Sequence, residues 1–162
     1  MPSARKRSTA GIRKWRMRSC ATVKKKMKCD DCIFCKLANG DIPTAKVYED
    51  ADVAVILDAG PASRGHTLVL PKEHYAKLAE VPEALAGKLA ATAARIGEAQ
   101  KKALGALGYN IVINTDQAAG QTVFHCHVHV IPRYGNDEIA LWIPGEAADS
   151  ENVAKMIAGA IV

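Results

Sequence analysis

Three histidines at alternate positions constrain the fold of this chain more than any other feature. His125, His127 and His129 lie in a run from Val123 to Ile131 that is otherwise mostly apolar. Successive side chains point to opposite faces of a β-strand, so this spacing predicts a strand with all three imidazoles on one face and Cys126 on the other. Histidine is seldom a core residue, which makes packing alone a weak explanation. Three interpretations remain open: a surface or satisfied histidine row, a metal site built from all three, or a nucleophilic row.

The rest of the pattern predicts an α+β fold. The Ala-rich segment 82–104, interrupted only by Gly87 and Gly97, is predicted to form one long helix. Because only this helix could serve as a crossover, we expect a mostly antiparallel five-stranded sheet with the long helix packed on it and a short N-terminal helix beside it. The predicted strands cover 46–49, 53–57, 67–70, 109–114 and 123–131, and the other predicted helices cover 32–38 and 151–160.

Basic residues are concentrated at the start of the chain. Residues 1–28 hold 11 of the 22 lysines and arginines and no acidic residue, which leaves 11 basic against 17 acidic residues in the remainder. We therefore predict a basic, disordered extension over 1–28 and one folded domain over 29–162, with nucleic-acid binding unlikely to explain the charge. The alternatives for the extension are a segment upstream of a true start at Met27 and an organelle-targeting peptide.

The five cysteines and the absence of a long apolar run argue against a membrane protein and against a disulfide-rich secreted protein. No run reaches the roughly 18 apolar residues of a membrane span, so we predict no membrane partner. An odd number of cysteines argues against a disulfide-stapled secreted scaffold. We predict a cytoplasmic protein with reduced thiols, or an organellar one if residues 1–28 form a transit peptide.

A loop with donors to phosphate precedes the histidine row. Gly120, Gln121 and Thr122 come shortly before His125, and Asn114 ends the preceding predicted strand. Glycine backbone, hydroxyl and amide groups together can donate to phosphate oxygens. This neighbourhood favours a nucleophilic row over the other two interpretations.

Several separated motifs resemble those of the histidine triad (HIT) family. Residues 120–131 match the family signature His-φ-His-φ-His-φ-φ, where φ is apolar, and residues 32–36, 41–43, 49–50 and 65–72 also resemble the family in the same order. The chain is most similar to the Hint branch, whose bacterial members carry a Cys-x-x-Cys motif. The resemblance covers roughly residues 30–142 and implies a HIT-like fold and a homodimer.

The resemblance also implies roles for single residues. His127 would be the nucleophile that attacks the α-phosphorus and forms a nucleotidyl-histidine, which water then hydrolyses. Its imidazole must be neutral, with the other ring nitrogen oriented by an acceptor such as a backbone carbonyl. His129 is similar to the residue that contacts phosphate and leaving-group oxygens, and Asp58 to the acid that holds the ribose hydroxyls. The remaining nucleotide-binding candidates are Phe34, Ile33 and Leu57 for the base and Asn114, Gly120, Gln121 and Thr122 for the phosphate.

Cys32 and Cys35 form half of a tetrahedral metal site, and His66, His74 and His125 are candidates for the other half. Related galactose-phosphate uridylyltransferases and bacterial Hint-like proteins use a histidine after the third predicted strand together with the first triad histidine. The resemblance therefore implies a structural zinc ion on Cys32, Cys35, His74 and His125. The alternative is a pair of reduced, metal-free thiols. His66 is then expected to be a structural, hydrogen-bonding residue near the site.

The predicted function is hydrolysis of purine nucleotide derivatives, as a nucleoside phosphoramidase or nucleotidyl hydrolase. Hydrolysis of dinucleoside polyphosphates is an alternative that uses the same nucleophile. Nucleotidyl transfer to a sugar phosphate is disfavoured, because those relatives have glutamine where this chain has His129. A different class of function is a zinc-stabilised nucleotide-binding or scaffolding dimer whose slow hydrolysis is incidental.

Overall fold

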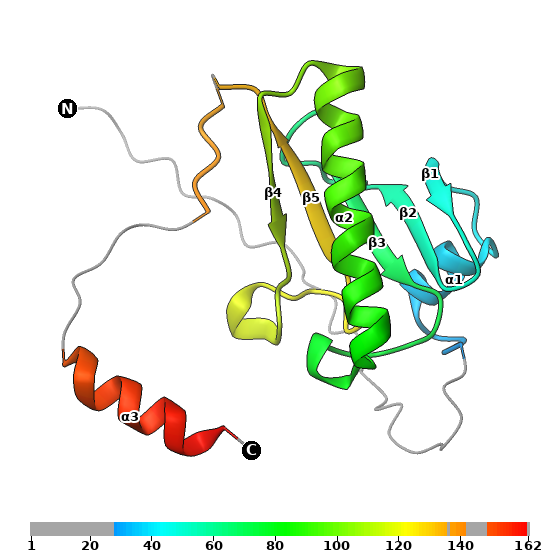
Figure 1. Ribbon diagram of the computed structural model, residues 1–162. Helices are drawn as coiled ribbons and strands as arrows, with labels where there is room; N and C mark the ends of the chain where they lie inside the picture. The colour runs from blue at the N-terminus through cyan, green and yellow to red at the C-terminus, as the bar shows by residue number, and fades with distance from the viewer. Residues whose placement is uncertain (1–27, 136, 142–148, 162) are drawn as a thin grey trace, which may run out of the picture.

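The computed structural model describes residues 28–135, 137–141 and 149–161, and its elements are shown in Figure 1. The predicted extension over 1–28 therefore lies outside the described residues, apart from Lys28. The helices are α1 (Ile33–Asn39), α2 (Glu83–Leu104) and α3 (Ser150–Ala160), with short 3₁₀ turns at Leu78–Glu80 and Gln117–Ala119; the strands are β1 (Lys46–Glu49), β2 (Val53–Leu57), β3 (Thr67–Pro71), β4 (Gly108–Val112) and β5 (Val128–Arg133).

The five strands form one sheet in the order β1-β2-β3-β5-β4, and every neighbouring pair is antiparallel. Helix α2 lies across β3, β5 and β4, whereas α1 packs against β2 and β3 (Figure 1). This arrangement confirms the predicted α+β class. No helix in the described part of the chain is long and apolar enough to cross a membrane.

Alternating side chains give the sheet two apolar faces. Val53 and Val55 of β2 pack with Leu89 of α2, while Ala54 and Ile56 from the same strand pack with residues around α1. This division follows from the two-residue period of a strand. The face on the α1 side is the one that carries His129, since Val128 and Val130 belong to the cluster around α2.

The ends of α2 follow the expected chemistry. Glu83 lies in the first turn, Lys101 and Lys102 lie in the last turn, and each sign of charge opposes the partial charge at that end of the helix. Gly105 adopts a left-handed conformation, with φ of 73°, and its N–H donates to the carbonyl of Lys101. Glycine is favoured at this position because a Cβ would be strained there.

The start of β5 differs from the prediction. A strand over 123–131 was expected, but β5 begins at Val128, so only His129 of the three histidines lies in the strand. The segment before it bends: the N–H of His125 donates to the carbonyl of Val123, and the N–H of Cys126 donates to the carbonyl of Tyr75. These bonds replace ladder pairing before Val128. The predicted alternation still holds, because Cys126 packs in the cluster around α2 whereas His125 and His127 lie against Phe34 of α1.

The partner strand β4 ends early for the same reason. Its last pair is Val112 with His129, so Asn114 lies beyond the ladder and in the following loop. The other elements match their predicted ranges to within one or two residues. Helix α3 was predicted over 151–160 and is exposed along its whole length.

Substitution by alanine at two glycines of α2 should change the stability of the protein in opposite directions. A Cβ on the buried Gly97 would lie 2.5 Å from the Tyr109 ring, whereas a Cβ on the exposed Gly87 would have no heavy atom within 4 Å. We predict that Gly97→Ala lowers the free energy of unfolding by about 1–3 kcal/mol, because the helix must move away from β4. The matched Gly87→Ala should raise it by about 0.5–1 kcal/mol through helix propensity. Urea denaturation measures both, and equal effects would contradict this packing.

Candidate functional site

A pocket of about 350 Å³ opens on the α1 side of the sheet. His127 and His129 line it together with Asp58 and Thr122. Its apolar part comes from α1, β2 and β3 and from the segments before β1 and after β2. The apolar lining residues are Phe34, Leu37, Pro43, Ile56, Leu57, Ala59 and Leu68.

His127 is buried, and its hydrogen bonding fixes its tautomer. Nδ1 lies 2.7 Å from the carbonyl oxygen of His125. A carbonyl only accepts, so Nδ1 carries the proton and Nε2 retains its lone pair. Burial lowers the pKa of His127, which favours the neutral ring. The Phe34 ring packs against this ring in a T-shaped arrangement, with centroids 5.0 Å apart. The result is a neutral imidazole with an unprotonated nitrogen at a pocket.

His129 lies beside His127, with ring centroids 4.8 Å apart. Its Nδ1 is 3.0 Å from Nε2 of His66, a residue at the end of the loop that precedes β3. Burial, with smaller contributions from His127 and His66, lowers the pKa of His129 to about 4. Burial also lowers the pKa of His66. All three imidazoles are thus favoured in their neutral forms near pH 7.

Asp58 follows β2 and offers one carboxylate oxygen toward these histidines. Its Oδ1 accepts the N–H of Gly60 at 2.8 Å, which holds the turn. Its Oδ2 lies 3.6 Å from Nε2 of His66 and 3.9 Å from Nδ1 of His129. These distances exceed a good hydrogen bond, so Oδ2 keeps capacity for further donors.

The predicted phosphate-binding residues divide into two groups. Thr122 is exposed and lines the pocket. Gly120 has φ of +87°, and a Cβ there would lie 3.8 Å from the Asn114 side-chain nitrogen, so these two residues are neighbours. Gln121 is instead buried, and its side chain accepts the N–H of Asp116 and donates to the carbonyl of Ala76. Its amide holds the loop in place rather than facing the pocket.

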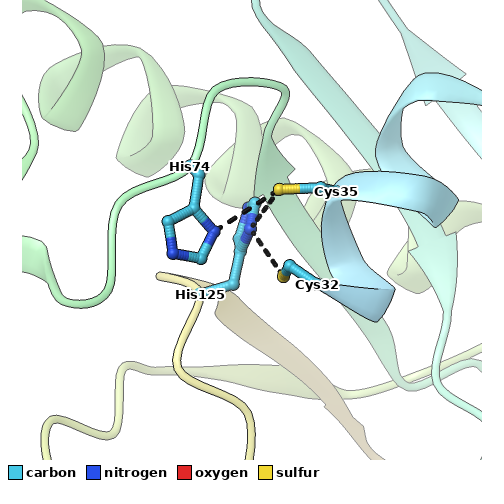
Figure 2. Close-up of side chains that lie close together, drawn as sticks. All are labelled: Cys32, Cys35, His74 and His125. Atoms are coloured by element: carbon cyan, nitrogen blue, oxygen red, sulfur yellow. Dashed lines mark hydrogen bonds between the residues drawn. The ribbon is translucent and has the colours of Figure 1, made fainter. Parts of the chain in front are cut away.

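The four predicted metal ligands lie together at the end of α1 (Figure 2). Cys32 precedes the helix and Cys35 lies in its first turn, so a spacing of three residues places both sulfurs on one side. His74 follows β3, and His125 lies in the bend before β5. Every ligand atom of these four residues lies within 4.8 Å of the others.

The distances and the donor set fit a zinc ion. Nδ1 of His125 is 3.5 Å from Sγ of Cys32 and 3.4 Å from Sγ of Cys35, and Nδ1 of His74 is 3.4 Å from Sγ of Cys35. Tetrahedral Zn²⁺ with ordinary bond lengths requires sulfur–nitrogen separations of roughly 3.6 Å. Nε2 of His125 lies 2.9 Å from the carbonyl of Pro71, which leaves Nδ1 as the ligating nitrogen. Hydrogen bonding from Cys35, opposed by burial and aided by His125 and His74, lowers the pKa of Cys32, and the same contact raises the pKa of Cys35, so one thiolate is favoured in the pair.

A second cluster, Asp58, His66 and His129, has comparable spacing but fits a metal poorly. Nδ1 of His66 accepts the N–H of Ala62 at 3.1 Å. A neutral imidazole that accepts at Nδ1 must carry its proton on Nε2, and this protonated nitrogen is the one that faces the cluster. We therefore interpret this cluster as a hydrogen-bond network.

Several residues that line the pocket, Ile56 and Leu68 among them, were not predicted from the sequence. Ile56 pairs with Leu68, and Leu68 pairs with His129, so these three side chains share one face of the sheet. Alternation within each strand was visible in the sequence, but the pairing register was not. Ile33, expected at the base slot, is absent from the described residues that line the pocket. Cys126 is buried in the core beneath α2, as predicted.

Comparison with known proteins identifies relatives over most of the chain. The HIT domain family matches residues 39–136. An uncharacterized HIT-like protein of Methanocaldococcus jannaschii is 44% identical over 79% of this chain and 99% of its own length. An adenylylsulfatase of Arabidopsis thaliana is 42% identical over 70% of this chain and 56% of its own length. An adenosine 5′-monophosphoramidase of Schizosaccharomyces pombe is 39% identical over 69% of this chain and 80% of its own length.

A solved structure supports the same relationship. A Zn-bound histidine triad family protein from Mycobacterium smegmatis superposes with a TM-score of 0.66 and 38% identity, over 80% of this chain and 97% of the other. The sheet order, the histidine pocket and the cysteine–histidine cluster are thus found in a chain whose sequence and fold both match one family. The chain belongs to the HIT family.

Proposed function

We propose that this chain hydrolyses purine nucleotide derivatives at the α-phosphate, with His127 as the nucleophile. The observation that carries the proposal is the fixed tautomer of His127, whose Nδ1 proton is held by the His125 carbonyl. Its relatives include proteins named as an adenylylsulfatase and an adenosine 5′-monophosphoramidase, which supports a hydrolase of nucleotides in general. A leaving group attached through nitrogen, as in a phosphoramidate, is the substrate class we favour.

The proposed reaction has two displacements at phosphorus. Nε2 of His127 donates its lone pair to the α-phosphorus, the bond to the leaving group breaks, and that group departs with its bonding electron pair and takes up a proton. Water then attacks the nucleotidyl-histidine, the phosphorus–nitrogen bond breaks, and a nucleoside monophosphate is released. The electron pair of that bond returns to Nε2, which restores the neutral imidazole, and the attacking water releases a proton to solvent.

The surrounding residues supply binding and charge stabilisation in this proposal. His129 donates to oxygens of the phosphate, and Thr122 provides a hydroxyl at the pocket. Oδ2 of Asp58 accepts from the ribose hydroxyls, and Phe34 packs against the base. Asn114 and Gly120 complete the phosphate loop, and Gln121 holds that loop through its buried amide.

Two other functions share these residues. Dinucleoside polyphosphate hydrolysis would use the same nucleophile with a phosphate leaving group. A zinc-stabilised nucleotide-binding or scaffolding dimer would use the pocket without significant turnover. Homodimerisation and a cytoplasmic location are parts of the proposal that rest on the family resemblance and on the sequence.

The cluster of Cys32, Cys35, His74 and His125 would hold a structural zinc ion. When bound, zinc would supply a rigid four-ligand clamp between α1, the segment after β3 and the bend before β5. His125 also provides the carbonyl that orients His127, so the position of this residue affects the nucleophile directly. We therefore propose a structural rather than a catalytic metal.

His127→Ala tests the proposed nucleophile. Turnover of a purine nucleoside phosphoramidate should fall by roughly 10³-fold or more, because the variant lacks the nitrogen proposed to attack phosphorus. Affinity for the nucleoside monophosphate, measured by calorimetric titration, should stay within an order of magnitude. Wild-type turnover in the variant would contradict the assignment, and wild-type protein that binds the nucleotide without hydrolysing substrate would favour the binding function.

Elemental analysis of purified protein tests the metal site. We predict one zinc per chain, lost in Cys32→Ser with a fall in Tm of roughly 10 °C. Cys29→Ser is the matched control, since Cys29 touches Cys35 through its backbone N–H, which serine keeps. The control should retain zinc. Zinc-free wild-type protein, with Cys32→Ser as stable as wild type, would contradict the site.

A further inference from the structure

We infer that His66 is a positioning residue that fixes the tautomer of His129, so that His129 presents an N–H at Nε2. His66 itself is buried and is not among the described residues that line the pocket. Its ring instead lies against the ring of His129, with centroids 5.1 Å apart. The inference deepens the proposed function and rests on it for its catalytic consequence.

The direction of the hydrogen-bond chain is set by the backbone. The N–H of Ala62 can only donate, and it lies 3.1 Å from Nδ1 of His66. The neutral His66 ring must then carry its proton on Nε2, which lies 3.0 Å from Nδ1 of His129. That proton is donated to His129, so His129 Nδ1 is the acceptor and Nε2 bears its hydrogen.

The competing acceptor is too distant to reverse this direction. Oδ2 of Asp58 lies 3.6 Å from Nε2 of His66, compared with 3.0 Å for Nδ1 of His129. Burial keeps the pKa of His66 low, and the pKa of His129 is also lowered by burial. Both rings therefore stay neutral, and the single proton between them is the one that Nε2 of His66 donates to Nδ1 of His129.

The loop that carries Ala62 is held firmly enough to impose this direction. Ser63 donates its hydroxyl to the carbonyl of Pro132 at 2.7 Å, which ties the loop to β5. The N–H of His66 donates to the carbonyl of Ser63, and the N–H of Asp58 donates to the carbonyl of His66. Gly65 has φ of +87°, a conformation that glycine adopts without strain. The donor is thus part of an anchored turn.

The tautomer matters because the proposed substrate is an anion. An N–H at Nε2 of His129 stabilises the charge on phosphate oxygens, whereas the opposite tautomer would direct a lone pair at them. His127 and His129 therefore need opposite tautomers: the first must present a lone pair and the second a proton. In each case the group that faces Nδ1 determines the tautomer. This group is a carbonyl oxygen for His127 and an N–H of His66 for His129.

Histidine ¹⁵N spectra of the full chain test the inference without any substrate. Long-range ¹H–¹⁵N correlations distinguish protonated from unprotonated ring nitrogens, and wild-type His129 should be protonated at Nε2 alone near pH 7. His66→Gln can still place an N–H donor where Nε2 was and should preserve this pattern. His66→Asn is too short to reach His129 and should give a mixture of both tautomers. Protonation of wild-type His129 at Nδ1 would overturn the inference and requires no variant to fold.

Kinetics with a purine nucleoside phosphoramidate provide the second readout. We expect kcat/KM to fall about 10–100-fold in His66→Asn and to stay within about threefold of wild type in His66→Gln. Equal losses in both variants, with the His129 tautomer unchanged, would show a merely structural role and overturn the inference. If wild-type protein hydrolyses no nucleotide, the proposed function fails, while the spectra still decide the tautomer separately.

Discussion

The hydrogen bond between Nδ1 of His127 and the carbonyl of His125, 2.7 Å long, joins the two halves of the site. On one side of it, the His125 ring lies against two cysteine sulfurs and the carbonyl of Pro71. On the other side, His127 faces the pocket with its remaining nitrogen. Because one residue serves as a metal-ligand candidate and as the acceptor for the nucleophile, a disturbance of either region affects the other. The length of this hydrogen bond therefore depends on the positions of the sheet, the bend before β5 and helix α1.

Backbone groups set the ring tautomers of the three histidines, directly for His125 and His127 and, as we infer, through the His66 side chain for His129. His125 faces the carbonyl of Pro71, His127 faces the carbonyl of His125, and His129 receives the proton of a His66 ring oriented by the N–H of Ala62. Backbone groups have one possible role in a hydrogen bond, so they specify direction without ambiguity. In the proposed function, the same ring type thereby offers a lone pair toward the cysteine cluster, a lone pair toward the pocket and an N–H at neighbouring positions. Burial supports this division by keeping His127 and His129 neutral.

Local sequence patterns predicted the elements but not the contacts between them. The limits of β2 follow from a short apolar run, and α2 follows from its alanine content. The start of β5 could not be predicted, because it depends on where β3 and β4 stop pairing and on bonds from Cys126 to Tyr75, which lies 51 positions earlier in the chain. Alternation nevertheless assigned His125 and Cys126 to the correct sides, toward α1 and toward α2 respectively. The family resemblance named the four residues of the cysteine–histidine cluster, but the buried amide of Gln121 and the contact between His66 and His129 required the tertiary structure.

The nucleophile is tested most directly by mass spectrometry of protein mixed with a purine nucleoside phosphoramidate and quenched during the first turnover. We predict a peptide that contains His127 and carries one added nucleoside monophosphate through a phosphorus–nitrogen bond. The adduct should be acid-labile, as such bonds are, and should map to His127 rather than to His125 or His129. Rapid turnover with no adduct, or an adduct on another residue, would contradict the central role of His127.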